Sequence, residues 1–211
     1  AARAFVRFEG KHQSLPGTTL TVQVDDKANA LIDVDQFVPL SSESKDYVAL
    51  GLAVSMFGGN ALDNRLAERI RKKDGLSYGI HTTLQAPRWG DRGYFGIEGS
   101  YAPQNRERVL AALREETDRA LKEGFTEAEL ERARASAVQG RMQRWNNDDA
   151  IASTLISQLD DGETFAKVAT RDAEYKSVTL AEVNAAFRKY VKPNDWLIGL
   201  AGDFAKAAAK N

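Results

Sequence analysis

One stretch organises the interpretation of this sequence: Gly58-Gly59-Asn60-Ala61-Leu62-Asp63-Asn64-Arg65-Leu66-Ala67-Glu68-Arg69-Ile70-Arg71-Lys72-Lys73-Asp74-Gly75-Leu76-Ser77-Tyr78. The pattern predicts a glycine break, a helix over about residues 61–73, and a glycine turn into a strand. Its inward stripe would be Leu62, Leu66, Ala67 and Ile70. The last turn is cationic, as the helix dipole prefers, and Gly75 would end the helix. Arg71 and Tyr78 then stand on either side of one tight turn.

The residues before this stretch predict two strands and a buried helix. Residues 19–24 and 28–37 have strand patterns, and the second strand would place Asp33 and Asp35 on the face opposite to Val34. Residues 45–57 are apolar enough for a buried helix. The double glycine would stop that helix in the left-handed conformation.

The residues after it predict a hairpin and then helices. Residues 78–86 and 93–102 alternate as two antiparallel strands. A helix from Pro103 to about residue 122 would end at Gly124, and residues 126–129 form a capping box. Apolar residues then recur at helical spacing to Leu159, with a kink predicted at 146–149. A helix over 179–190 and a strand over 196–201 close the chain.

This order of elements favours an α+β fold, in which a mostly antiparallel sheet carries helices packed on one face. The long helices are expected to lie across that face. We expect residues 1–211 to form a single domain, because no linker composition and no internal repeat interrupt the chain. The start Ala1-Ala2-Arg3 without a methionine suggests a piece of a longer multidomain protein.

Composition excludes several classes of function. A net charge of -1 gives no global field to attract nucleic acid or an acidic membrane surface. No apolar run approaches the roughly 20 residues that cross a bilayer. The chain has no cysteine, which excludes disulfides, thiolate metal sites and a cysteine nucleophile.

The residues also argue against a complete catalytic centre within this chain. His12 and His81 are the two histidines, and neither has a zinc-ligand partner at helical spacing. His81 is expected on the strand face opposite to Tyr78 and Ile80. The glycine pair lacks the lysine and hydroxyl of a phosphate loop. The acidic pairs lack the alternate spacing of a calcium loop, and Ser77 does not lie in a nucleophile elbow.

Arg71 and Tyr78 remain as candidate binding residues. A guanidinium and a phenol above one turn could both donate hydrogen bonds to a peptide carbonyl, as donors do in stabilising an oxyanion. The alternative is purely structural, since an arginine in the last turn often serves the helix dipole and a strand tyrosine often packs. From spacing alone both interpretations stay open.

Six sequence pieces in order resemble the last domain of bacterial pitrilysin/insulinase-type zinc metallopeptidases. They are residues 26–30, the double glycine followed by Asn64-Arg65-Leu66, residues 69–71 leading to 75–79, residues 102–105, residues 124–129, and residues 201–204. The resemblance covers about residues 26–204. It implies the LuxS/MPP-like metallohydrolase fold.

In that family an inverted zinc motif, His-x-x-Glu-His, lies in the first half, and two halves close around a peptide as a clamshell. This sequence has no such motif. The resemblance implies that Arg71 and Tyr78 bind substrate near the scissile carbonyl, that Gly75 supports the turn between them, and that zinc lies in a partner half, attached or separate. It also implies a periplasmic location, with a cytoplasmic one left open.

Two other functions compete with a substrate-binding peptidase domain, which would be inactive alone. One is a non-catalytic structural or protein-binding domain that retains the peptidase fold. The other is an independent hydrolase that uses Ser77 or the carboxylates. Mutation of Arg71 and Tyr78 discriminates between the substrate-binding domain and the non-catalytic domain. The independent hydrolase would require activity of this chain alone in the presence of a chelator.

Overall fold

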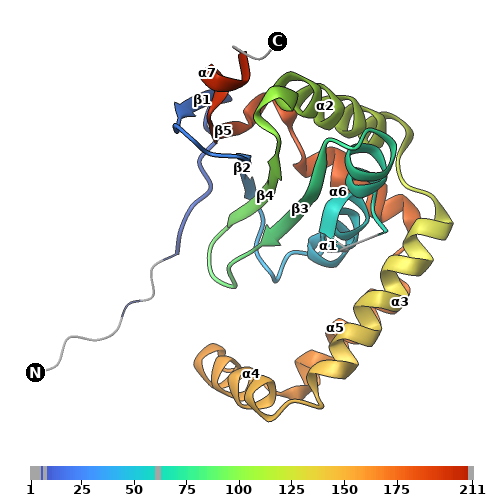
Figure 1. The fold of residues 1–211 in the computed structure, drawn as a ribbon. Coiled ribbons are helices and arrows are strands. Elements are labelled where there is room, and N and C mark those ends of the chain that lie inside the picture. The colour runs from blue at the N-terminus through green and yellow to red at the C-terminus, as the bar shows by residue number, and fades with distance from the viewer. Residues whose placement is uncertain (1–5, 7–8, 60–62, 209–211) are drawn as a thin grey trace, which may run out of the picture.

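The computed structural model describes residue 6 and residues 9–59 and 63–208, and its centre is a five-stranded sheet (Figure 1). The strands are β1 Thr18–Gln23, β2 Ala30–Pro39, β3 Ser77–Gln85, β4 Arg92–Tyr101 and β5 Leu197–Gly202. They lie in the order β1-β5-β2-β4-β3. β1 runs parallel to β5, whereas the other neighbours are antiparallel. The predicted mostly antiparallel sheet is therefore confirmed.

Helices cover one face of this sheet (Figure 1). The helices of the described residues are α1 Tyr47–Val54, α2 Arg106–Glu123, α3 Glu127–Arg144, α4 Asp148–Asp161, α5 Phe165–Ser177, α6 Leu180–Tyr190 and α7 Phe204–Ala208, with π-helices Ser55–Gly59 and Ala67–Lys73 and 3-10 turns Pro103–Asn105 and Pro193–Asp195. The capping box that opens α3 is formed as predicted, since the side chains and backbone of Thr126 and Glu129 cap one another.

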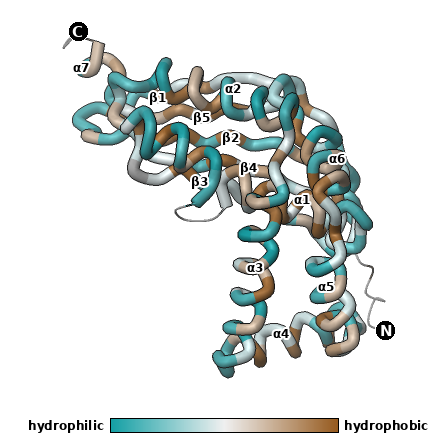
Figure 2. The backbone as a smooth tube through the Cα atoms, turned by 90° about the vertical axis from the view of Figure 1, so that its right-hand side faces the viewer, coloured by the Kyte–Doolittle hydropathy of each residue, from teal (hydrophilic) through white to brown (hydrophobic). Residues whose placement is uncertain are grey.

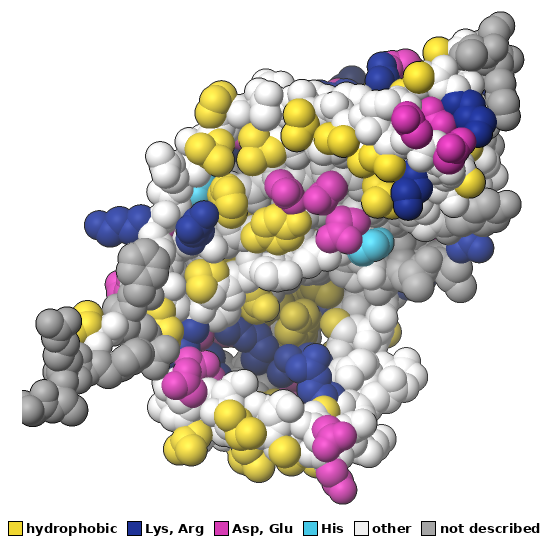
Figure 3. Space-filling model, turned by 60° about the vertical axis from the view of Figure 1, so that its left-hand side comes forward, with side chains coloured by type: hydrophobic (Ala, Val, Ile, Leu, Met, Phe, Trp, Pro, Cys, Tyr) yellow, Lys and Arg dark blue, Asp and Glu magenta, His cyan; other side chains and the backbone are white. Residues whose placement is uncertain are grey.

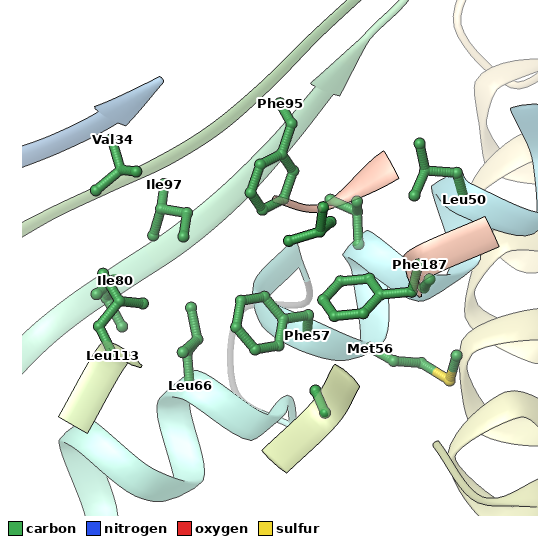
Figure 4. Packing of buried hydrophobic residues seen from close by; sticks show 14 of the residues in the cluster. Val34, Leu50, Met56, Phe57, Leu66, Ile80, Phe95, Ile97, Leu113 and Phe187 are labelled. Carbon is green, nitrogen blue, oxygen red and sulfur yellow. The ribbon is translucent and has the colours of Figure 1, made fainter. Parts of the chain in front are cut away.

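The core lies between the sheet and helices α1, α2 and α6 (Figure 4). Alternate residues of β2 are buried, as its sequence pattern predicts, so that Val34 points inward and Asp33 outward. From the helices, Phe57 packs against Phe187 with ring centroids 5.3 Å apart. Burial of such side chains stabilises the fold by roughly 2 kcal/mol each.

The helices after α2 do not all lie on the sheet, and this expectation was wrong. α3, α4 and α5 form an arm that projects away from the sheet (Figures 1 and 2). At its end Ile156 is 69% exposed and Leu159 84% exposed. Within the arm, α3 ends at Arg144 and Asn147 caps α4, because its side chain accepts from the amide of Ala150. The break falls at the kink predicted for residues 146–149, but helical spacing alone could not reveal that the helices on both sides of it leave the sheet.

The double glycine has a different role from the one predicted. Among the described residues, positive φ occurs at Gly75, Gly90, Gly124 and Gly162 and at Asp26, and not at Gly58 or Gly59. α1 continues through both glycines as a π-helix. Close packing explains Gly58, since a Cβ there would lie 2.6 Å from Cγ2 of Thr82.

Candidate functional site

The helix before the turn is held by its buried face. Asn64 caps it, because its side-chain oxygen accepts from the amide of Ala67 at 2.7 Å. Leu66 and Ile70 are fully buried. Leu62, which was predicted to share this face, lies outside the described residues. The segment Ala67–Lys73 is a π-helix rather than the α-helix that the spacing suggests, and π-turns are frequent at functional sites.

The turn itself is tight and depends on Gly75. Its φ of 62° is in the left-handed region that favours glycine. Immediately after it, the amide of Leu76 donates to the carbonyl of Ile70 at 2.8 Å, and the Leu76 side chain is buried. The end of the helix is therefore fixed, and β3 begins at Ser77, two residues after Gly75.

A β-bulge at the start of β3 contains Tyr78. Ser77 pairs with Tyr101 of β4, whereas Gly79 pairs with Ser100, so Tyr78 is the extra residue between them. The Ser77 hydroxyl fixes the bulge by donating to the carbonyl of Ser100 at 2.5 Å. A bulge re-aims the side chains around it and often lies beside active sites. The side chain of Tyr78 is outside the described part of the structure.

The bulge also limits the alternation predicted for β3. Ile80 is buried and His81 exposed, as the sequence suggests. Ser77 is buried as well, although it has the same odd parity as His81. The two-residue repeat therefore starts only after the bulge, and Tyr78 cannot be assigned to the face of Ile80 by counting.

Arg71 is an exposed cation on the π-helix. Its neighbours are engaged in ion pairs: Arg69 pairs with Glu115 at 2.8 Å and with Asp74, and Lys72 pairs with Glu68 at 2.9 Å. Within residues 9–59 and 63–208, no carboxylate forms an ion pair with Arg71. Its guanidinium therefore has no acidic partner in this part of the chain that a ligand would need to displace.

A mostly buried ion pair anchors the same helix to α3. The guanidinium of Arg65 donates to the two carboxylate oxygens of Glu129 at 2.7 and 2.9 Å and to the carbonyl of Gly124 at 2.7 Å. It also lies over the ring of Phe125. Burial raises the pKa of Glu129, but the hydrogen bonds from Arg65 and Thr126 outweigh it and lower the pKa. Arg65 and Glu129 thus hold the helix that carries Arg71.

The described residues do not fit a zinc site. They contain no group of three or more His, Asp or Glu side chains that could hold a metal ion. The side chain of His81 has Glu98 as its neighbour, at 3.6 Å. Ser77 is buried, with its hydroxyl committed to backbone carbonyls of β3 and β4. The arrangement of Ser77 is structural rather than that of a nucleophile.

Two hollows lie near charged side chains of both signs. One, of about 780 Å³, is lined by residues of the π-helix, α2 and α3, including Glu68, Arg119 and Glu123. The other, of about 540 Å³, lies between the arm and the body and is lined by Arg88, Glu163 and others. Figure 3 shows dark-blue basic side chains within a hollow below the sheet. Ion pairs such as that of Arg88 with Glu163 neutralise much of this charge.

Sequence reasoning missed a group of acids on the open face of the sheet. Asp33 of β2 pairs with Glu98 of β4, and Asp35 lies two residues along β2. The outward direction of Asp33 and Asp35 was readable from the alternation in β2. The register that brings Glu98 beside Asp33 was not, because hairpin-loop length alone does not fix the pairing of β2 with β4.

Comparison with protein families identifies the chain. A family model described as "Peptidase M16 inactive domain" matches residues 6–137. The chain belongs to this family. A search of curated proteins found no match. Zinc in M16 proteases belongs to the active domain, whereas this chain is the inactive one.

Solved structures share the fold of this M16 inactive domain. A peptidase M16 inactive domain from Pseudomonas fluorescens has a TM-score of 0.83 at 20% identity, over 95% of this chain and 47% of that chain. The inactive peptidase domain of a candidate zinc protease from Bordetella parapertussis has a TM-score of 0.69 at 18% identity, over 82% of this chain and 91% of that one.

The periplasmic protease PqqL from Escherichia coli has a TM-score of 0.71 at 16% identity, over 88% of this chain and 20% of that chain. This M16 inactive domain therefore spans 47% of the length of the Pseudomonas structure and 20% of that of PqqL. Among the described residues, no helix is long and apolar enough to cross a membrane.

Proposed function

We propose that this chain is the substrate-binding, metal-free part of a zinc metalloendopeptidase, in which Arg71 and Tyr78 contact the carbonyl at the scissile bond. The observation that carries the proposal is the exposed guanidinium of Arg71, which has no carboxylate partner among the described residues. It lies on the helix that turns at Gly75 into the bulge at Tyr78. Family membership supplies the context of peptide hydrolysis.

The chemistry follows from two donors of different kinds. A guanidinium is a permanent cation with several N–H groups, and a phenol donates one O–H. Both would stabilise the negative charge that develops on the carbonyl oxygen during hydrolysis. The metal, its water and the general base would lie in an active M16 half, in the same polypeptide or in a separate subunit.

The length of the similar structures supports the proposal that the whole protein contains at least one more domain. Since residues 1–211 match about half of the Pseudomonas structure, we propose that they form one domain of a longer peptidase. Its two halves would enclose the peptide substrate as a clamshell. The likeness to a periplasmic protease favours the periplasm as its compartment.

The test is mutation of the pair in the peptidase assembled with its zinc-bearing half. Arg71→Ala and Tyr78→Phe should each lower kcat about a hundredfold, as loss of an oxyanion donor does, with zinc content unchanged. Lys72→Ala is the matched control, since Lys72 is an exposed cation on the same helix but already pairs with Glu68. Unchanged turnover in both Arg71→Ala and Tyr78→Phe would refute the proposal.

A second candidate is a non-catalytic domain that keeps the peptidase fold and binds protein. The description of the matching family as inactive favours it. Under this function Arg71→Ala and Tyr78→Phe would leave cleavage unchanged. Removal of the whole domain would still disrupt assembly, as size-exclusion chromatography of the complex would measure.

A further inference from the structure

One face of the sheet is left uncovered by the helices that the structure describes (Figure 1). Figure 3 shows this face with acidic side chains gathered in its middle and hydrophobic side chains around them. The outward-pointing residues of β2 and β4 include Asp33, Asp35 and Glu98. Since the described helices lie on the opposite side, Asp33 and Glu98 are exposed on this face (Figure 3).

The acids lie next to one another in the strand register. Asp33 pairs with Glu98, and Glu98 pairs with His81 of β3. Partial burial, followed by the charges of Asp35 and Glu98, raises the pKa of Asp33. Asp35 accepts a hydrogen bond from the hydroxyl of Tyr94 at 2.6 Å. The three carboxylates therefore repel one another, and folding holds them together.

No lysine or arginine of the described residues pairs with these acids. Within residues 9–59 and 63–208, no Lys or Arg forms an ion pair with Asp33, Asp35 or Glu98. Arg92 stands on the same face, but its guanidinium lies over the ring of Phe37, 4.8 Å from the centroid. By contrast, Glu43, Glu129 and Asp172 each pair with an arginine or lysine. Among the described residues, the basic group beside these carboxylates is His81, whose Nε2 lies 3.6 Å from Glu98, and no lysine or arginine pairs with them.

Apolar side chains extend the same face beyond the acids. Leu20 and Val22 of β1 are 65% and 46% exposed, and Leu31 of β2 is 57% exposed. Val22 and Leu31 both lie beside Ala201 of β5, and Leu20 lies beside Gly199 in the row that contains Asp33. A strip of aliphatic surface thus borders the acidic centre.

We propose that this open face of the sheet binds an extended polypeptide segment that carries a lysine or arginine flanked by apolar residues. The cationic head would sit among Asp33, Asp35 and Glu98, and the apolar neighbours would cover Leu20 and Leu31. Charge complementarity chooses this occupant, since an acidic or uncharged segment would leave the carboxylates unmatched. The inference rests on the proposed function, because it names the kind of peptide that such a domain would hold.

The experiment measures fluorescence anisotropy of labelled peptides with the 211-residue chain. The probe is an unstructured peptide with one lysine between leucine and valine residues, and the comparison peptides have glutamate or glutamine in place of that lysine. We expect the lysine peptide to bind at least about tenfold more tightly than either, and its binding to weaken with salt. Equal binding of the three peptides would overturn the inference.

Variants locate the binding surface. Asp33→Asn with Glu98→Gln should weaken binding of the lysine peptide about tenfold, while preserving side-chain shape. The matched control is Glu107→Gln with Glu131→Gln, which removes the same charge from exposed acids on α2 and α3. A loss in the control equal to that in the double variant would overturn the inference, since it would mean attraction by net charge alone.

The same measurements separate this inference from the proposed function. In one outcome, Asp33→Asn with Glu98→Gln abolishes binding of the lysine peptide, while Arg71→Ala and Tyr78→Phe leave turnover of the peptidase unchanged. That outcome would support binding at the open face and refute the proposed function. Binding that survives that double variant but is lost in Arg71→Ala would refute the open face and leave the proposed function standing. Circular dichroism of each variant checks that it is folded.

Discussion

Arg65 donates to both carboxylate oxygens of Glu129, across 64 positions of sequence, and the pair joins the helix that carries Arg71 to the start of α3. Arg65 and Glu129 side chains are both mostly buried. Glu129 also accepts from the amide and hydroxyl of Thr126. One carboxylate therefore serves as helix cap and ion-pair partner.

Replacing this carboxylate should destabilise the protein. We expect Glu129→Gln to lower the free energy of unfolding by about 2 kcal/mol, because hydrogen bonds to a charged group are lost in a mostly buried place. Urea denaturation measures the change. Glu131→Gln is the control, since Glu131 is exposed and pairs only with Arg134. Equal effects of the two substitutions would contradict the role given to Glu129.

The same pair predicts a pH dependence. Because the folded state lowers the pKa of Glu129, its stabilisation is fully present above the unfolded value and is lost as pH falls through the folded pKa. The wild type should therefore lose stability in acid more steeply than Glu129→Gln. Denaturation curves measured between neutral pH and about pH 3 compare the two; parallel losses would contradict the assignment.

Substitution of Gly75 should cost stability through the backbone alone. A Cβ at Gly75 would meet nothing within 4 Å, yet its φ of 62° is unfavourable for other residues. We expect Gly75→Ala to destabilise by about 1 kcal/mol and Gly75→Asn by less, because asparagine tolerates the left-handed region. Both should lower turnover of the assembled peptidase more than Lys72→Ala does, if the turn positions Tyr78.

Gly75 and Gly58 show what the sequence could and could not predict. Gly75 has the left-handed φ expected of a glycine that ends a helix. Gly58 does not, because its constraint comes from Thr82, which lies 24 positions later and contacts it only in the folded chain. Local conformational preference is readable from neighbouring residues, whereas close approach depends on tertiary packing.

The same distinction between local preference and tertiary packing explains which other sequence predictions the structure confirms. The burial alternation of β2, the hairpin of β3 and β4 and the N-terminal capping box of α3 follow from short-range patterns, and each is confirmed. The arm and the acidic face depend on where elements pack and on strand register. The roles of Arg71 and Tyr78 stay predictions, since they depend on a ligand and on the active half.

Close packing at Gly58 should be sensitive to one added methyl group. Gly58→Ala would place Cβ 2.6 Å from Cγ2 and 3.0 Å from Oγ1 of Thr82. We expect a loss of about 2 kcal/mol, as for other overpacked cores. Thr82→Ser should partly restore stability in Gly58→Ala, because it removes the methyl group and keeps the hydroxyl that donates to Val54. Thermal denaturation of the single and double variants tests this; the absence of any rescue would assign the cost to Leu66 instead.

Removal of the Asp33 charge should stabilise the protein while weakening its binding of cationic peptide. The folded state raises the pKa of Asp33, so its charged form is disfavoured by folding. Asp33→Asn should therefore raise the midpoint of thermal unfolding at neutral pH. This advantage should shrink as pH falls and the wild-type Asp33 itself becomes protonated.

The sign of this effect distinguishes a ligand site from ordinary structure. The groups that face Asp33 are Asp35, Glu98, His81, Tyr94 and, further along, Arg92. Neutralising a structural carboxylate such as Glu129 should destabilise the protein, whereas neutralising Asp33 should stabilise it, because no lysine or arginine among the described residues pairs with Asp33. Differential scanning calorimetry of Asp33→Asn at neutral and acid pH, with Glu107→Gln as control, measures the gain. A lower midpoint for Asp33→Asn at neutral pH would mean that Asp33 already has a stabilising partner within the protein, and would remove the electrostatic argument for a cationic ligand.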